Sequence, residues 1–328
     1  MQAQVNLSAL NSEYRKKQIT ELLIQNEDHL LNKFSGDRSI PADKILPYVF
    51  KEIINRVSNG DSIAEGLLDK EEERATGLVI GEFAPWDSEQ FGQNMGKIVL
   101  ALFDPTTGLE TRASTVRSVV KRLGASMVSA RISLKDLKTI QALESEGALL
   151  TDVLLTLRFE FDGFKPVLRP KGIVVGSAKE DDESELRRLG TTVFTVDRFH
   201  GDPRLSKSKS DEAYGKWVSN SLHGLADIVL VARRDSQVIG FITCKIENAA
   251  DHCKFGVIDL VGVNPSYSGL GVGHDLLASA LEWFQDRVGS VYVGTQASNS
   301  RAVRLYEKSG FRHVNSEATF HLWPTLPS

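Results

Sequence analysis

The segment VGVNPSYSGLGVGHDLLASALEWF, residues 261–284, constrains the fold more than any other part of this 328-residue chain. An apolar run ends at Val263, an Asn-Pro pair interrupts it, and a helical pattern follows Gly269, Gly271 and Gly273. A glycine-rich turn at the start of a helix leaves outward-pointing N–H groups that attract anions, phosphate above all. The segment therefore predicts a strand, a phosphate-binding turn and a helix. A turn that needs glycine only for positive φ is the alternative interpretation.

Two widespread phosphate-binding motifs do not fit this segment. A P-loop needs a lysine followed by serine or threonine after its glycines, and GLGVGHD contains none of these residues. The dinucleotide-binding fingerprint G-x-G-x-x-G has a different spacing, and no βαβ unit begins here. Both motifs are therefore excluded.

A second informative segment, VYVGTQASNSRAVRLYEKSGF, covers residues 291–311. A strand is predicted up to Thr295, with Asn299 as the N-cap of a helix over 300–308. Asn299 and Tyr306 are seven positions apart, so two helical turns place them on roughly the same face. Gly310 then fits the left-handed position just after a helix.

Taken together, VNPSYSGLGVGHDLL and ASNSRAVRLYEKSGF resemble the two signature motifs of the GNAT superfamily of acetyl-CoA-dependent N-acetyltransferases. The resemblance covers about residues 170–328. It implies an α/β (α+β) fold with a mixed, largely antiparallel sheet. It also implies acetyl-CoA as cosubstrate, no metal, and direct transfer of the acetyl group to a primary amine.

The resemblance further implies which residues meet the cofactor. Backbone amides of the glycine turn would hold the coenzyme A pyrophosphate, and the end of the preceding strand would pair with the pantetheine arm. Asn299 would hold the cofactor near its thioester, and Tyr306 would act as a hydrogen-bonding acid, because a phenol (pKa ~10) is a weaker acid than a thiol (pKa ~8.5). The expected cofactor contacts are Val261, Val263, Ser268, Gly269, Leu270, Gly271, Val272, Gly273, Asn299 and Tyr306.

Ser268 departs from the family pattern. GNAT motifs often have arginine or glutamine at this position, followed by two residues and then the glycine that is Gly271 here. A serine hydroxyl can donate a hydrogen bond to phosphate but carries no charge. Cofactor binding is therefore expected either to use other basic groups or to be weaker.

The acceptor amine must be neutral when it attacks. A lysine amine (pKa ~10.4) needs a base for this, whereas a sugar amine is less basic and needs less help. Asp259, between Ile258 and Leu260 on the predicted strand, is the acidic catalytic candidate, with an outward-facing structural role as the alternative. His200, His223 and His274 have no stronger claim, and neither Cys244 nor Cys253 has an activating base.

The loop TVDRFHGDPRL, residues 195–205, precedes the helix that borders the acceptor cleft in GNAT proteins. With WDSEQFG (86–92) and the two-lobe layout, it resembles the TDP-fucosamine acetyltransferases, which acetylate a nucleotide-linked amino sugar. The resemblance implies a nucleotide amino-sugar acceptor, and the expected substrate-binding residues are Arg198, His200 and Arg204. A solvated loop with local ion pairs is the alternative.

Length alone indicates about two domains. We predict a helical N-terminal extension (1–75), a degenerate GNAT-like lobe (76–168) and a GNAT catalytic domain (169–328). The proline- and glycine-containing stretch 162–172 marks the second boundary. A weak repeat supports the two lobes, because LESEGA (143–148) matches YEKSGF (306–311), with leucine in place of the tyrosine.

Composition limits the partners. The net charge of −4 argues against a nucleic-acid binder that relies on bulk positive charge. Two cysteines cannot build a disulfide framework, and the chain has neither a signal-peptide pattern nor a long apolar run, so a cytoplasmic location is expected. The expected partner is a small-molecule amine, with a homo-oligomer left open. A non-catalytic acyl-CoA sensor and a protein or peptide acetyltransferase are the alternative functions.

Overall fold

The computed structural model describes residues 2–6, 13–25, 49, 51–53, 55, 62–69, 74–162, 172–250 and 253–324. It contains two compact units, Met1–Val153 with Ser316–Ser328, and Leu154–Asn315. The predicted boundary between 168 and 169 lies outside the described residues. The second unit begins earlier than this boundary, inside strand β6 (Leu149–Glu160), because the C-terminal part of that strand pairs within the second unit.

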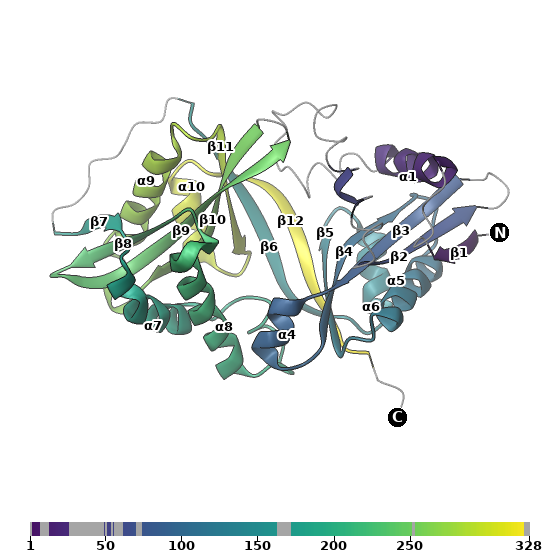
Figure 1. Ribbon diagram of the computed structural model, residues 1–328, viewed down its shortest axis with the longest axis horizontal. Coiled ribbons are helices and arrows are strands. Elements are labelled where there is room, and N and C mark those ends of the chain that lie inside the picture. Colours follow the sequence, from purple (N-terminus) through teal and green to yellow (C-terminus); the bar gives the residue numbers. More distant parts are fainter. Residues whose placement is uncertain are drawn as a thin grey trace. The chain divides into compact units, whose positions relative to one another are not determined.

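The first unit is built on a sheet with the strand order β1-β2-β3-β4-β5-β12 (Figure 1). Neighbouring strands are antiparallel except β4 and β5, which are parallel. The strands are β1 (Gln2–Asn6), β2 (Ser62–Asp69), β3 (Arg74–Phe83), β4 (Met95–Phe103), β5 (Met127–Ser133) and β12 (Arg312–Leu322).

Helices cover both faces of this sheet. Helix α1 (Glu13–Gln25) contacts β3 and β4, while α5 (Leu109–Leu123) contacts β2, β3 and β4 and packs against α6 (Leu137–Ser145). A short helix α4 (Pro85–Phe91) follows β3. Side chains of a strand alternate between faces, so Val79 joins the core under α5, whereas Leu78 and Ile80 join the core under α1.

The predicted helical extension over residues 1–75 is wrong in part. Helix α1 lies in this range, but β1, β2 and the start of β3 are strands. The sequence of β2, SIAEGLLD, has no regular alternation and contains a glycine and two acidic residues. It is a strand because it pairs with β3 from Ser62 to Asp69, a long-range contact that the local pattern does not contain.

The second unit has the strand order β6-β11-β10-β9-β8-β7. Neighbours are antiparallel except β10 and β11, which are parallel. This agrees with the predicted mixed, largely antiparallel sheet. The further strands are β7 (Val174–Ser177), β8 (Ile228–Arg234), β9 (Gln237–Ala250), β10 (Cys253–Val263) and β11 (Ser290–Gln296).

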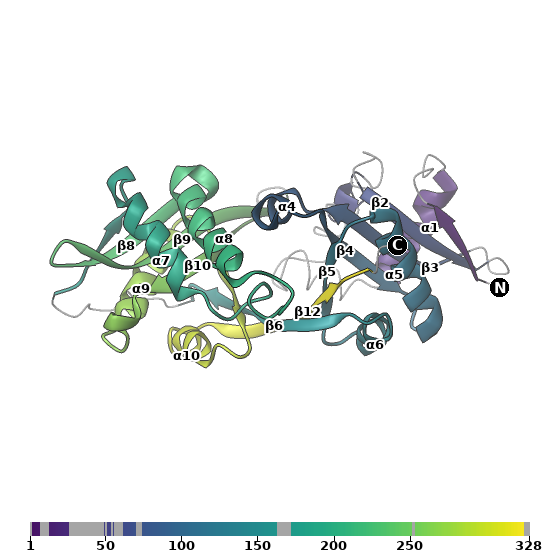
Figure 2. The same cartoon turned by 90° about the horizontal axis from the view of Figure 1, so that it is seen from below.

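Helices cover both faces of this second sheet (Figure 2). One face carries α9 (Val272–Phe284) and α10 (Ser300–Lys308), which share one apolar core. The other face carries α7 (Glu183–Val193) and α8 (Lys207–Asn220), which pack on each other. The described residues of the unit also form the short helical turns η2 (Glu180–Asp182), η3 (Ser221–Leu225) and η4 (Pro265–Tyr267).

Helices α7 and α8 approach each other closely at two glycines. A Cβ atom at Gly190 would lie 3.0 Å from the Gly215 Cα atom and 3.0 Å from the Tyr214 carbonyl oxygen. A Cβ atom at Gly215 would in turn lie 2.7 Å from Thr191 Cγ2. The two backbones are therefore in direct contact, and larger residues at these positions would push the helices apart.

We expect Gly190→Val to lower the free energy of unfolding by about 1–3 kcal/mol, because overpacking here meets backbone atoms that cannot rotate away. Gly289→Val is the matched control, since a Cβ atom at Gly289 meets nothing within 4 Å. Urea unfolding followed by circular dichroism measures both variants. Equal midpoints for the two variants would contradict the close helix contact.

Candidate active site

The site begins where β10 and β11 separate. Their pairing is confined to three residue pairs among the described residues, from Gly256–Val291 to Ile258–Val293. On its other side β10 stays paired with β9 as far as Val263–Gly240. The register between β10 and β9 shifts between Ile258 and Leu260, so Asp259 is the extra residue of a β-bulge. From Asp259 onward, β11 does not pair with the neighbouring edge of β10, and an extended chain can add to such an edge.

The predicted glycine turn lies between β10 and α9. Gly269 and Gly271 have φ values of 81° and 83°, which side chains other than glycine rarely adopt. Gly271 is the N-cap of α9 and has no side chain to accept hydrogen bonds from the first-turn N–H groups. Ser268 and Leu270 are exposed, whereas Val272 is buried in the core under the helix. This arrangement leaves the first turn of α9 suited to an external acceptor.

Three segments of the predicted site meet at Gly273. A Cβ atom there would lie 3.2 Å from Leu305 Cδ2 of α10 and 3.8 Å from Val263 Cγ2 of β10. Val261 and Val263 both pack against the core shared by α9 and α10. The end of β10, the start of α9 and the middle of α10 are therefore in contact, as the two sequence motifs together require.

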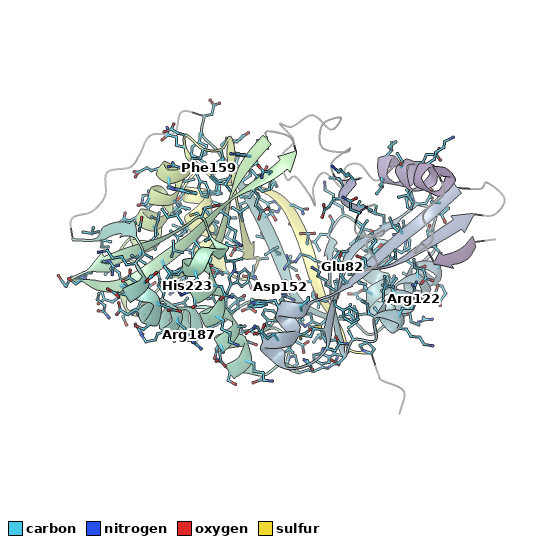
Figure 3. All side chains as sticks on the ribbon, viewed as in Figure 1. Glu82, Arg122, Asp152, Phe159, Arg187 and His223 are labelled. Carbon is cyan, nitrogen blue, oxygen red and sulfur yellow. The ribbon has the colours of Figure 1, made fainter. Side chains whose placement is uncertain are left out.

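Tyr306 is buried in α10, with 4% of its surface exposed. Its ring centroid is 5.6 Å from that of Phe311, which in turn is 5.3 Å from that of Phe159 on β6. Figure 3 labels Phe159 among the side chains of the second unit. Burial raises the pKa of the Tyr306 hydroxyl well above its ordinary value, so the phenol stays protonated. This hydroxyl makes no hydrogen bond with any of the described residues. It is a buried donor available to a ligand.

Asn299 is the N-cap of α10, as predicted. Its Oδ1 atom accepts a hydrogen bond from the backbone N–H of Ala302 at 3.2 Å. The oxygen of the carboxamide is thereby used in the cap, and the Nδ2 amino group remains as a donor.

Asp259 forms an ion pair with Lys245 on the neighbouring strand β9. Both side chains are largely buried, 18% exposed for Asp259 and 21% for Lys245. Lys245 was not predicted as a site residue, because only the pairing of β9 with β10 brings it beside the bulge. The Asp259 carboxylate is therefore in contact with an ammonium group of the chain itself.

His200 is clamped between two carboxylates. Its Nδ1 atom lies 2.5 Å from Asp197 Oδ2, and its Nε2 atom lies 2.9 Å from Asp211 Oδ1 on α8. The ring is 6% exposed and stacks on Tyr214. Hydrogen bonding to Asp197, and secondarily to Asp211, raises the pKa of His200 despite its burial. Both ring nitrogens are occupied, so this predicted substrate ligand has no ring nitrogen left for an acceptor.

The two predicted arginines lie in the same loop. The Arg198 guanidinium stacks over the Phe199 ring, with its Cζ atom 4.0 Å from the ring centroid, and Arg204 is exposed. Asp202, which is buried, accepts a hydrogen bond from the Arg204 backbone N–H at 2.9 Å. The loop therefore holds its shape through its own carboxylates, with Arg204 exposed and Arg198 half-buried against Phe199.

Two further observations bear on the chemistry. Cys244 is fully buried, and burial raises the pKa of its thiol, which disfavours a nucleophilic thiolate. The described residues contain no cluster of three or more His, Cys, Asp or Glu side chains that could hold a metal ion.

None of the described helices is both long and apolar enough to cross a membrane.

The His200 clamp predicts a pH-dependent stability. The folded pKa is raised above the ordinary value of 6.5, so the stabilisation is complete below about pH 6.5 and is lost as the pH rises through the folded pKa. His200→Gln should therefore lower the free energy of unfolding by about 1–3 kcal/mol more at about pH 6 than at about pH 9. Urea unfolding across this range measures the difference. His313→Gln, at an exposed position, is the control. A pH-independent effect of His200→Gln would contradict the clamp.

Comparisons with known proteins agree with this geometry. Residues 193–311 match the Acetyltransferase (GNAT) family. The chain is 25% identical over 256 residues to the spore coat polysaccharide biosynthesis protein SpsD of Bacillus subtilis, covering 77% of this chain and 86% of SpsD. It is 37% identical over 171 residues to a mycothiol acetyltransferase of Thermomonospora curvata, covering 51% of this chain and 54% of that protein.

Solved structures show the same fold. A GCN5-related N-acetyltransferase from Sphaerobacter thermophilus aligns with a TM-score of 0.62 at 14% identity, covering 100% of this chain and 98% of that one. A tandem GNAT protein from the clavulanic acid biosynthesis pathway aligns with a TM-score of 0.54 at 13% identity, covering 100% of both chains. The family match covers the glycine turn, Asn299 and Tyr306, so residues 193–311 form a GNAT-family acetyltransferase domain and the protein is an acyltransferase.

Proposed function

We propose that the second unit transfers an acetyl group from acetyl-CoA directly to a primary amine, and that the acceptor is a nucleotide-linked amino sugar. The observation that carries this proposal is the contact of β10, α9 and α10 at Gly273, beside a buried tyrosine with an unused hydroxyl. This arrangement offers anion-binding amides, a free strand edge and a protonated donor within one unit.

The residues of the site fit acetyl-CoA. The pyrophosphate would accept hydrogen bonds from the amides between Gly269 and Gly273, where positive φ and open space admit a close approach. The pantetheine amides would pair with the β10 edge at Val261 and Val263, which β11 leaves unpaired. The Nδ2 group of Asn299 would donate to the arm near the thioester.

The reaction follows from these contacts. The neutral amine attacks the thioester carbonyl, an N–C bond forms, and the resulting oxyanion is stabilised by N–H groups at the end of β10. The C–S bond then breaks and its electron pair leaves with sulfur. Tyr306 donates a hydrogen bond or its proton to this thiolate, and the nitrogen loses one proton, so that the products are an amide and a thiol.

The acceptor amine must be neutral when it attacks the thioester. We propose that Asp259 on β10, which forms an ion pair with Lys245, is the general base that accepts the proton lost by the amine nitrogen. A lysine side chain (pKa ~10.4) is protonated near neutral pH and must lose a proton before it attacks. An amine flanked by electron-withdrawing sugar oxygens needs less assistance, which favours an amino sugar over a peptide lysine.

The relatives and the acceptor loop point in the same direction. SpsD is named for spore coat polysaccharide biosynthesis, a sugar-related process. The loop 195–205 presents Arg198 and Arg204, and arginine pairs well with the phosphates of a nucleotide sugar. His200 contributes by fixing this loop to α8.

Tyr306→Phe is expected to reduce kcat by about 10²-fold, the usual effect of losing a positioned acid, with little change in the affinity for acetyl-CoA. Tyr292→Phe is the matched control, because it removes a hydroxyl from another buried tyrosine. Steady-state kinetics with thiol detection and calorimetric binding of acetyl-CoA give the two quantities. An unchanged kcat would remove Tyr306 from the mechanism.

The acceptor is tested with three classes of amine: nucleotide-linked amino sugars, free amino sugars and lysine-containing peptides. We expect release of coenzyme A to be fastest with the nucleotide-linked class, and Arg198→Gln with Arg204→Gln to raise KM for that class alone. Faster turnover of peptides would indicate a protein acetyltransferase. Binding of acetyl-CoA without turnover of any amine would indicate a sensor.

A further inference from the structure

Arg301 lies against the glycine turn. It is in the first turn of α10, and its Nη1 atom donates a hydrogen bond to Ser268 Oγ at 3.3 Å. Ser268 directly precedes Gly269 and occupies the position where GNAT motifs often carry arginine or glutamine. A guanidinium group from α10 thus lies beside the position that lacks a charge in this chain.

Within the described part of the chain, no carboxylate neutralises the charge of Arg301. Its hydrogen bond goes to the neutral Ser268 hydroxyl. Other arginines of this unit differ, since Arg233 pairs with Asp182 and Arg187 with Glu212. Arg301 is also exposed, so its charge is accessible to a dissolved anion.

An acidic side chain also lies at this turn. Asp275, in the first turn of α9, is 1% exposed, and neither of its carboxylate oxygens is hydrogen-bonded within the described structure, while His274 Nδ1 lies 3.7 Å from its Oδ1 atom. An acidic side chain near the start of a helix offsets part of the positive potential that would otherwise attract an anion. A cation beside the turn counteracts this effect on a bound pyrophosphate.

We propose that Arg301 binds the pyrophosphate of coenzyme A and supplies, from α10, the charge that Ser268 does not. This inference rests on the proposed function, because it assumes that acetyl-CoA is the ligand of the glycine turn. Arginine can form two parallel hydrogen bonds with a phosphate. Ser268 accepts from Arg301 and keeps its own hydroxyl proton to donate to the same anion.

The first experiment compares acetyl-CoA with S-acetylpantetheine, which lacks the pyrophosphate together with the 3′-phosphoadenosine attached to it. Arg301→Gln should raise the Kd for acetyl-CoA by about tenfold, as expected for one charge-assisted hydrogen bond, and leave the binding of S-acetylpantetheine unchanged. Arg287→Gln is the matched control. It removes one exposed arginine just beyond the other end of α9, about 20 Å from the turn by the rise of the helix, and should change neither Kd.

The second experiment moves the charge back to the position used by the family. Ser268→Arg in the Arg301→Gln background should restore most of the affinity for acetyl-CoA. The wild-type Kd should also rise more steeply with salt than the Kd of Arg301→Gln, because salt screens an exposed ion pair. Isothermal titration calorimetry at low and moderate salt measures both effects.

Each outcome separates this inference from the proposed function. Tight binding of acetyl-CoA by the wild type and by Arg301→Gln alike would overturn the inference and leave the proposed function standing. An equal loss of S-acetylpantetheine binding would show that Arg301 only supports α10, which also overturns the inference. Wild-type protein that binds no acetyl-CoA would overturn both.

Discussion

The separation of β10 and β11 after three paired residues is the constraint on which the candidate site depends. Because β11 leaves β10 after Ile258, one edge of β10 has no strand partner among the described residues from the bulge at Asp259 onward. The same departure carries the chain from β11 into α10, whose Leu305 reaches Gly273 at the start of α9. A sheet with full pairing here would offer neither an open strand edge nor a place for two helix N-termini to meet. The glycine turn, Asn299 and Tyr306 all acquire their positions from this one interruption.

Local patterns predicted much of the second unit and little of the contacts between its elements. The glycines of the turn, the Asn299 cap and the mixed sheet follow from residue types and spacing, because each depends on neighbours within a few positions. The clamp on His200 and the contact of Arg301 with Ser268 join residues 11 and 33 positions apart. No periodicity encodes such pairs, so the sequence identified His200 as a candidate ligand and did not single out Arg301. Strand β2 was missed for the same reason, since its partner β3 supplies its hydrogen bonds.

The two units share a local design that supports the predicted duplication. Helix α6 begins at Asp136, whose Oδ1 atom accepts from the Thr139 backbone N–H at 3.1 Å, as Asn299 Oδ1 accepts from Ala302 in α10. Both helices have nine residues and are followed by a glycine with positive φ, Gly147 at 76° and Gly310 at 92°. Seven residues after each cap stands Leu143 in one unit and Tyr306 in the other. The scaffold of the helix is thus repeated, and the hydroxyl that could serve a thiolate is present in the second unit alone.

The turn that leads into α5 also differs from its counterpart in the second unit, the turn that leads into α9. The N-cap of α5, Gly108, has an ordinary φ of −69°, whereas Gly271 has a φ of 83°. The loop before α5 satisfies its polar groups internally. Asp104 Oδ1 accepts from the Thr106 backbone N–H at 2.8 Å, and the buried Arg112 donates to the Asp104 and Thr107 carbonyl oxygens at 3.1 Å. The Asp104 carboxylate therefore occupies a backbone N–H group that a phosphate would need. An anion gains less at such a turn than at Gly271, where no carboxylate of the described residues binds the first-turn amides or Arg301, and this difference fits the proposal that only the second unit binds a cofactor.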